Sequence, residues 1–200
     1  MEVVIDVEKF YTRLALLRSK WLSSKTNLFA NADALVIPMG ATSDVMSYSK
    51  AAAIHLYLLG YEFSDSLMVL TKSTFYFMAT SKKCGYISDA MASSTLKSEV
   101  QIQFLFKTKE KTANEDQFGV ILNAIKKMSG SKVGSLLKPE CKGEFIPLWN
   151  TAVKTSGFET VDIANGLGVF LATKDEVELV KKELLFDPLY IVNGFLLIAY

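Results

Sequence analysis

The chain has 200 residues, of which 50% are hydrophobic and 22% are charged, and its formal net charge is +1. This balance excludes an intrinsically disordered chain, and the near-neutral charge lacks the basic footprint that nucleic-acid binding leaves on a whole domain. The N-terminus, MEVVIDVEKF, has an acid at position 2 and no long apolar core, so no signal peptide is predicted.

The first part of the chain predicts a helix followed by a buried strand. Apolar residues recur at helical spacing over residues 7–22, and Asp6 precedes them as the expected N-cap. The run 34–37 is apolar on both faces, which is typical of a strand that is covered on both sides. We expect Pro38 and Gly40 to end this strand.

A second helix and a β-hairpin come next. The stretch SKAAAIHLYLLG has Ser49 as its expected N-cap and Gly60 as its C-terminal stop, so it predicts a helix. Two short apolar stretches, SLMVLT and TFYFMAT, are joined by a tight turn at Lys72 and Ser73 and predict a hairpin. Because the strands of a hairpin are antiparallel, the sheet is expected to be mixed.

Helices and strands alternate through the rest of the chain. A short helix is expected over 81–92, and VQIQFLF predicts a strand near a sheet edge because its glutamines give it one wetter face. The charged stretch KTKEKTANED lacks apolar anchors and is expected to be a loop before a helix over about 118–128. KVGSLL and ETVDIA predict strands, and GEFIPLWNTAVKTSG predicts a helix with Pro147 in its first turn. ANGLGVFLATKDEVELVKKE predicts one or two helical segments.

This alternation predicts a single α/β domain, with a mixed β-sheet flanked by helices on both faces. The sequence offers few groups for catalysis inside it. His55 is the single histidine and lies between Ile54 and Leu56, so we expect a helix-surface or core histidine with one hydrogen bond. Cys84 and Cys141 lie far apart and are expected to be free thiols in a reducing compartment.

The motifs of the common catalytic and metal sites are absent from the sequence. HExxH, GxSxG and the phosphate-loop pattern GxxxxGK[ST] do not occur, and one histidine with two remote cysteines does not match zinc-ligand spacing. The charged clusters are typical of solvated surfaces: Glu62 and Asp65 bracket a turn, and Asp175 and Glu176 stand at a helix start. We therefore expect no catalytic residue, no metal and no cofactor.

Residues 48–83 carry a more specific pattern. It consists of a helix start at Ser49-Lys50, the segment LLGYEF, a polar turn, a hydrophobic strand and the pair Lys82-Lys83. This pattern resembles the N-terminal domain of the large subunit of FACT, the eukaryotic histone chaperone that reorganises nucleosomes. The stretches WLSSKTNLFANADALVI, GEFIPLWNTAV and VDIANGLGVFLATKDEVELVKK support the resemblance, which covers about 5–183. Ala51 and Ser64 depart from it, standing where Ser and Pro are usual.

The resemblance implies a fold and a function. The fold implied for residues 1–183 is like the N-terminal lobe of creatinase and aminopeptidase P, in a domain that looks like a peptidase without being one. The function implied is non-catalytic binding of histones H3–H4, as part of nucleosome reorganisation during transcription, replication and repair. It further implies a location in the nucleus on chromatin, and contact with the other FACT subunit where the rest of the protein is present. No sequence-specific binding of nucleic acid is expected.

The contact surface is predicted from charge and from the family pattern. The lysines of the pattern are candidates by resemblance, and nearby acids are candidates because histones are strongly basic. These candidates are Lys50, Lys82, Lys83, Glu62, Asp65, Asp175 and Glu176. Two alternatives remain open: the recognition lobe of a true X-Pro aminopeptidase or creatinase-like enzyme, and a folded remnant without function.

Residues 184–200, LLFDPLYIVNGFLLIAY, form a hydrophobic tail that the resemblance does not cover. A membrane-spanning helix is not expected, because Asp187, Pro188 and the Asn193-Gly194 pair interrupt a run shorter than the ~20 residues needed. Apolar stretches about Asn-Gly are typical of a β-hairpin. We expect a non-family ending that comes from truncation, alternative splicing or a gene-model error.

Overall fold

The computed structural model describes residues 3–41, 49–138, 141 and 143–172. Its centre is a six-stranded sheet with the strand order β4-β3-β2-β1-β5-β6. The strands are β1 (Ala34–Met39), β2 (Ser66–Leu70), β3 (Thr74–Ala79), β4 (Gln101–Phe106), β5 (Lys132–Ser135) and β6 (Glu159–Asp162). Strand β2 runs antiparallel to both of its neighbours, and the other pairs are parallel, so the sheet is mixed as the hairpin predicts.

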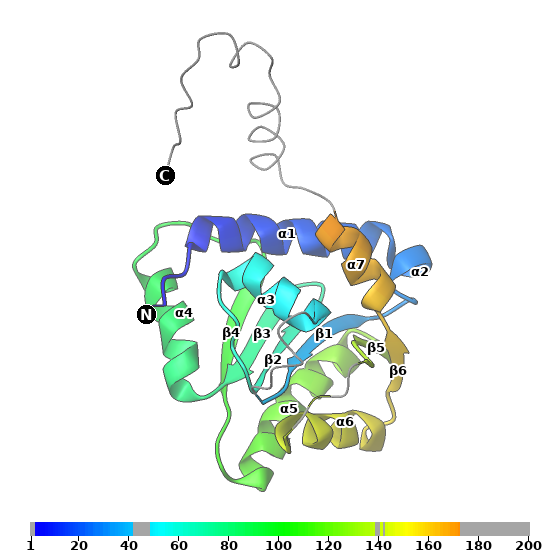
Figure 1. Cartoon of the computed structure of the whole chain (residues 1–200). Coiled ribbons are helices and arrows are strands. Elements are labelled where there is room, and N and C mark those ends of the chain that lie inside the picture. The colour runs from blue at the N-terminus through cyan, green and yellow to red at the C-terminus, as the bar shows by residue number, and fades with distance from the viewer. Residues whose placement is uncertain (1–2, 42–48, 139–140, 142, 173–200) are drawn as a thin grey trace, which may run out of the picture.

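Helices cover both faces of this sheet (Figure 1). One face packs against α1 (Val7–Ser23), α3 (Lys50–Leu59), α4 (Ser81–Ala92) and α7 (Ala164–Ala172), with the short α2 (Lys25–Leu28) beside them. The other face packs against α5 (Lys111–Lys127) and α6 (Phe145–Thr155). The fold class expected from the sequence is therefore confirmed.

The alternation of side chains along β1 divides the core into two layers. Leu35 and Ile37 pack with the helices of the first face, whereas Ala34 and Val36 pack with α5 and α6. All six residues of this strand are buried, because a central strand with helices on both sides has no wet face. Strand β1 therefore contributes side chains to both core layers.

Local sequence signals account for where the helices begin and end. The Asp6 carboxylate accepts a hydrogen bond from the Lys9 amide at 3.0 Å, and the Ser49 hydroxyl accepts one from the Ala52 amide at 3.1 Å. Gly60 ends α3 in the left-handed conformation, with φ of 69°. The predicted helices over 7–22 and 81–92, the hairpin, and the edge position of VQIQFLF are confirmed.

The prediction of a loop across KTKEKTANED is wrong, because α5 begins at Lys111 inside that stretch. The first turns of α5 need no apolar anchor, since the buried amide of Asn114 ties them to the preceding loop instead. Strand β1 also continues to Met39, past the expected stop at Pro38. Beyond Val36 it pairs with β2 alone, and a strand position with one unpaired side can lack a donor.

Two further boundaries differ from the sequence prediction. Strands β5 and β6 end at Ser135 and Asp162, so each is shorter than the apolar run that predicted it. The helical prediction for ANGLGVFLATKDEVELVKKE is met by α7 up to Ala172, and its remainder lies outside the described residues. The predicted tail over 184–200, with its expected hairpin, also lies outside them.

Candidate functional site

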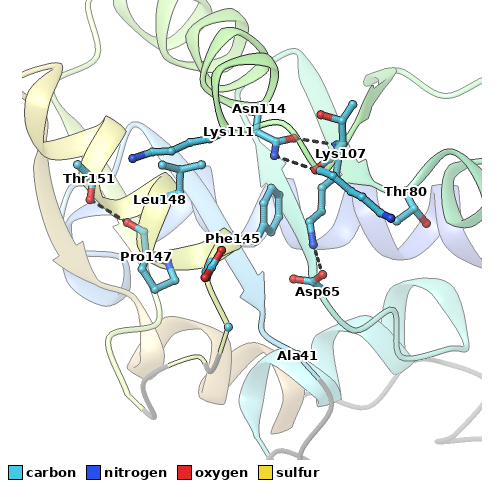
Figure 2. Close-up of a pocket in the computed structure, with 14 residues that line it drawn as sticks. Ala41, Asp65, Thr80, Lys107, Lys111, Asn114, Phe145, Pro147, Leu148 and Thr151 are labelled. Carbon is cyan, nitrogen blue, oxygen red and sulfur yellow. Dashed lines mark hydrogen bonds and ion pairs between the residues drawn. The ribbon is translucent and has the colours of Figure 1, made fainter.

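A cleft of about 900 Å³ opens at one edge of the sheet (Figure 2). Residues that follow the carboxyl ends of three parallel strands line it: Ala41 after β1, Thr80 after β3, and Lys107 after β4. The first turn of α6 closes another side with Phe145 and Leu148. In α/β sheets, ligands bind in the crevice outside the carboxyl ends of the strands, so this cleft is the candidate site.

Lys107 and Asp65 form an ion pair at the edge of the cleft. Their side chains retain 18% and 33% of their exposure, and the Lys107 ammonium also lies 4.8 Å from the centre of the Phe145 ring. Asp65 adopts a left-handed backbone with φ of 53°, which aspartate tolerates, and its amide donates to the Gly40 carbonyl at 2.7 Å. The pair therefore ties the start of β2 to the end of β4 across the mouth of the sheet.

The amide of Asn114 fixes the loop that carries the cleft's other lysines. It accepts a hydrogen bond from the Thr108 amide at 2.9 Å and donates one to the Thr108 carbonyl at 3.0 Å. Asn114 is only 5% exposed, so both bonds are sheltered from water. This contact holds Lys109 and Lys111 on the rim of the cleft. Figure 2 shows the Lys111 side chain extending from α5 toward the side where α6 places Leu148.

Lys83 joins the same charge cluster from α4. Its ammonium donates to the Ser64 carbonyl at 2.5 Å, next to Asp65 in the chain. Burial lowers the pKa of Lys83, the Asp65 carboxylate partly offsets this by raising it, and Lys107 lowers it further. Asp65 thus pairs with Lys107 and also acts electrostatically on Lys83, and the three groups together carry one surplus positive charge.

The structure brings some of the predicted contact residues together. Glu62, Asp65, Lys82 and Lys83 belong to the loop before β2 and the first turn of α4, which the contact from Lys83 to Ser64 joins. Within this group Glu62 and Lys82 are exposed, whereas Asp65 and Lys83 are partly buried and engaged. Lys50 is exposed and lies against α7, with its Cε 3.3 Å from where a Cβ on Gly168 would stand. Asp175 and Glu176 lie outside the described residues.

The cleft lysines were missed as a site in the sequence. Lys107, Lys109 and Lys111 lie in the stretch for which the sequence predicts a charged loop. These lysines are neighbours in the chain, but their place in the cleft depends on the contact of Asn114 with Thr108 and on the ion pair between Lys107 and Asp65, which are 42 positions apart. One sequence signal favours a helix start here, because a threonine hydroxyl can bond the backbone amide two residues on. In the structure the Glu110 amide donates to the Thr108 hydroxyl at 3.2 Å, directly before α5.

His55 lies in the core and not in the cleft. Its side chain is fully buried on α3, and neither ring nitrogen has a hydrogen-bond partner among the described residues. The expectation of a core or helix-surface histidine is met by the core position, but the expected hydrogen bond is not found there. Burial, with a smaller contribution from Lys83, lowers the pKa of His55 to about 3. The imidazole is therefore neutral and out of reach of solvent at physiological pH.

The two cysteines are free, as expected. The Cys84 thiol is buried among backbone carbonyls, with its Sγ 3.6 Å from the Leu105 oxygen. Burial raises the pKa of Cys84 to about 11 and raises that of Cys141 as well. A thiol rather than a thiolate stands at both positions near neutral pH, and a thiol is a poor nucleophile.

Two searches over the described part of the chain complete this picture. No group of three or more His, Cys, Asp or Glu side chains there is arranged to hold a metal ion. No helix there is both long enough and apolar enough to cross a membrane.

Comparison with protein families gives one match over most of the chain. Residues 5–166 match the model of the FACT complex subunit SPT16 N-terminal lobe domain. The chain is 34% identical over 184 residues to FACT complex subunit SPT16 of Gibberella zeae, and 30% identical over 183 residues to that of Arabidopsis thaliana. These alignments cover 89% and 87% of this chain but 17% of each relative, so the chain spans about a sixth of their length.

Solved structures show the same likeness. The N-terminal domain of FACT complex subunit SPT16 from chickpea superposes with a TM-score of 0.76 at 31% identity, covering 88% of this chain and 40% of that one. An X-prolyl aminopeptidase from Caenorhabditis elegans superposes with a TM-score of 0.51 at 16% identity, covering 84% of this chain and 26% of that one. The second likeness shows a shared fold alone, and this fold is the aminopeptidase-P-like one expected from the sequence.

Proposed function

The chain belongs to the family of the FACT complex subunit SPT16 N-terminal lobe, and we propose that it functions as a non-catalytic histone-binding module. Its proposed partner is histones H3–H4, in nucleosome reorganisation during transcription, replication and repair. The proposed location is the nucleus, on chromatin, with the other FACT subunit as a partner where the rest of the protein is present. The match over residues 5–166 is the observation that carries this proposal.

The state of the titratable groups supports binding over catalysis. A general base must reach its substrate with a pKa near the working pH, and His55 meets neither condition because it is buried and its pKa is about 3. The raised thiol pKa values of Cys84 and Cys141 disfavour nucleophilic catalysis in the same way. Asp65 is engaged with Lys107. Neither the histidine nor the two cysteines are in a state suited to proton transfer or nucleophilic attack.

The exposed members of the predicted contact set are the first choice for a histone surface. Glu62 is exposed in the loop before β2, and Lys82 is exposed in the first turn of α4. Lys50 is exposed at the start of α3. Asp65 and Lys83 serve the fold through their own contacts, so their substitution would mix a structural effect with a binding effect. Asp175 and Glu176 remain predictions from the sequence alone.

A pull-down of H3–H4 tests the proposal, with the purified chain as bait and the complete two-lobed domain of a relative as positive control. We expect both baits to retain H3–H4 in 150 mM salt. Retention by the two-lobed domain and none by this chain would contradict the proposal for this chain.

Charge reversal tests the surface. We expect Lys82→Glu to change the dissociation constant for H3–H4 about threefold or more, because a contact charge at an interface acts on both encounter and complex. Lys97→Glu is the matched control, since Lys97 is exposed in the loop between α4 and β4. Equal effects of the two reversals would remove Lys82 from the contact surface.

The shared fold keeps one rival function open to test. A recognition lobe of an X-Pro aminopeptidase would also have this architecture. We expect no cleavage of an Xaa-Pro dipeptide by the purified chain with added Mn²⁺ or Zn²⁺. Turnover that a chelator abolishes would favour the peptidase.

A further inference from the structure

We propose that the cleft at the carboxyl edge of the sheet binds an acidic peptide, with carboxylates at Lys109 and Lys111 and an apolar side chain against Pro147 and Leu148. This site is distinct from the exposed residues proposed for histone contact, because none of Glu62, Lys82 and Lys50 lines the cleft. It therefore does not depend on the function proposed above.

The first argument for an acidic ligand is the charge of the cleft. Three lysines line it, at 107, 109 and 111, against two acids, Asp65 and Glu144. Asp65 is already paired with Lys107 and is also close enough to Lys83 to raise the pKa of that lysine. Lys109 and Lys111 are exposed on the rim, and the one ion pair that the described residues give them, Lys111 with Glu115 at 4.0 Å, is long and exposed. Lys109 and Lys111 are thus available to an anionic ligand, against the single exposed carboxylate of Glu144.

The backbone adds to this positive potential. Helices α4, α5 and α6 all begin at residues that line the cleft or directly adjoin it, at Thr80, Glu110 and Glu144. None of these three N-cap side chains accepts a hydrogen bond from its own helix. At α4, whose N-cap Thr80 is uncharged, the partial positive charge of the first amides favours a carboxylate placed nearby, whereas at α5 and α6 the Glu110 and Glu144 carboxylates offset it.

The walls of the cleft point to a peptide. Pro147 is exposed and Leu148 is half-buried, so α6 offers an apolar surface opposite the lysine rim. The volume of about 900 Å³ is that of a pocket for a ligand of a few residues. A nucleic-acid groove would instead follow a backbone with several basic residues and stacking aromatics, whereas Phe145 is buried beneath the Lys107 ammonium. Carboxylates next to one apolar side chain fit these walls best.

The experiment measures fluorescence anisotropy of labelled peptides with the full chain. The probe is acetyl-Glu-Leu-Asp-Phe-Glu-Asp, the charge control is acetyl-Lys-Leu-Lys-Phe-Lys-Lys, and a third peptide carries Ser in place of Leu and Phe. The cleft variant is Lys109→Ser with Lys111→Ser. The matched variant is Lys97→Ser with Lys154→Ser, which removes the same charge from exposed positions that do not line the cleft. Thermal melts establish that all chains are folded.

We expect the acidic probe to bind, the basic peptide not to bind, and the Ser-containing peptide to bind several-fold more weakly. The cleft variant should bind the acidic probe about tenfold more weakly, since the two lost charge contacts are exposed and together are worth about that ratio. The matched variant should bind the acidic probe within about twofold of the unmodified chain, because its two lysines do not line the cleft and salt screens their effect at longer range.

Three results would overturn the proposal. The first is no binding of the acidic probe by the folded chain. The second is an equal loss in the cleft variant and the matched variant, which would show attraction to overall charge. The third is binding of a short DNA duplex that depends on Lys109 and Lys111 while the acidic peptide fails to bind.

Discussion

Two buried polar side chains on opposite faces of the sheet differ in their hydrogen bonding. Asn114 on α5 has its amide paired through both its oxygen and its nitrogen with the Thr108 backbone. His55 on α3 is buried at least as deeply, and neither of its ring nitrogens has a partner among the described residues. The comparison teaches that the Asn114 hydrogen bonds set the position of the surface lysines, whereas the histidine serves as packing.

Removal of the Asn114 amide should have the largest effect. Asn114→Ala deletes two sheltered hydrogen bonds and leaves Thr108 groups without partners, so we expect a loss of about 3 kcal/mol in the free energy of unfolding. Urea unfolding measures it, with Asn150→Ala on the exposed side of α6 as the control. A loss below about 0.5 kcal/mol would mean that the loop is held by other contacts.

Acid should destabilise the chain through His55. The folded pKa of about 3 lies below the ordinary 6.5, so between these values the unfolded chain binds one more proton than the folded chain. Stability is therefore flat above pH 6.5 for this group and falls by about 1.4 kcal/mol for each pH unit below it, or about 2 kcal/mol by pH 5.

His55→Phe isolates this effect, since phenylalanine does not titrate. The difference in unfolding free energy between the unmodified chain and the variant should change with pH only below 6.5. A difference that stays constant from pH 7.5 to pH 5 would show that the imidazole is accessible to protons in the folded chain.

Loss of the ion pair at the cleft mouth should have a smaller effect. Lys107→Met keeps the aliphatic stem over Phe145 but leaves Asp65 to Lys83 alone. Both partners are partly exposed, so we expect a loss of about 1 kcal/mol, which shrinks in high salt. Thermal melts at 50 mM and 500 mM NaCl measure it, and an unchanged melting temperature at both would show that the pair is solvated.

The two cysteine thiols should differ in their rate of alkylation, with Cys141 reacting faster than Cys84. Cys84 is fully buried and its pKa is about 11, whereas Cys141 is only half-buried. At pH 8 we expect iodoacetamide to modify Cys141 first and Cys84 only after unfolding, because the thiolate is the reactive form. Peptide mass spectrometry over time distinguishes the two, and early modification of Cys84 would contradict its placement in the core.

The elements could be predicted from the sequence because their signals are local. Asp6, Ser49 and Gly60 mark helix ends by their own chemistry, and apolar spacing marks the strands. The start of α5 was missed because its first turns are held by Asn114, a polar residue whose role depends on the loop it meets. The cleft was missed for a related reason: Asp65 and Lys107 meet only because the sheet order places β2 and β4 on either side of β3.

The most direct test of the account is a calorimetric titration of histones H3–H4 with the purified chain at physiological salt. The account requires saturable binding with a defined stoichiometry, a dissociation constant that Lys82→Glu changes about threefold or more, and no change with Lys97→Glu. The absence of saturable heat from a folded sample would contradict it.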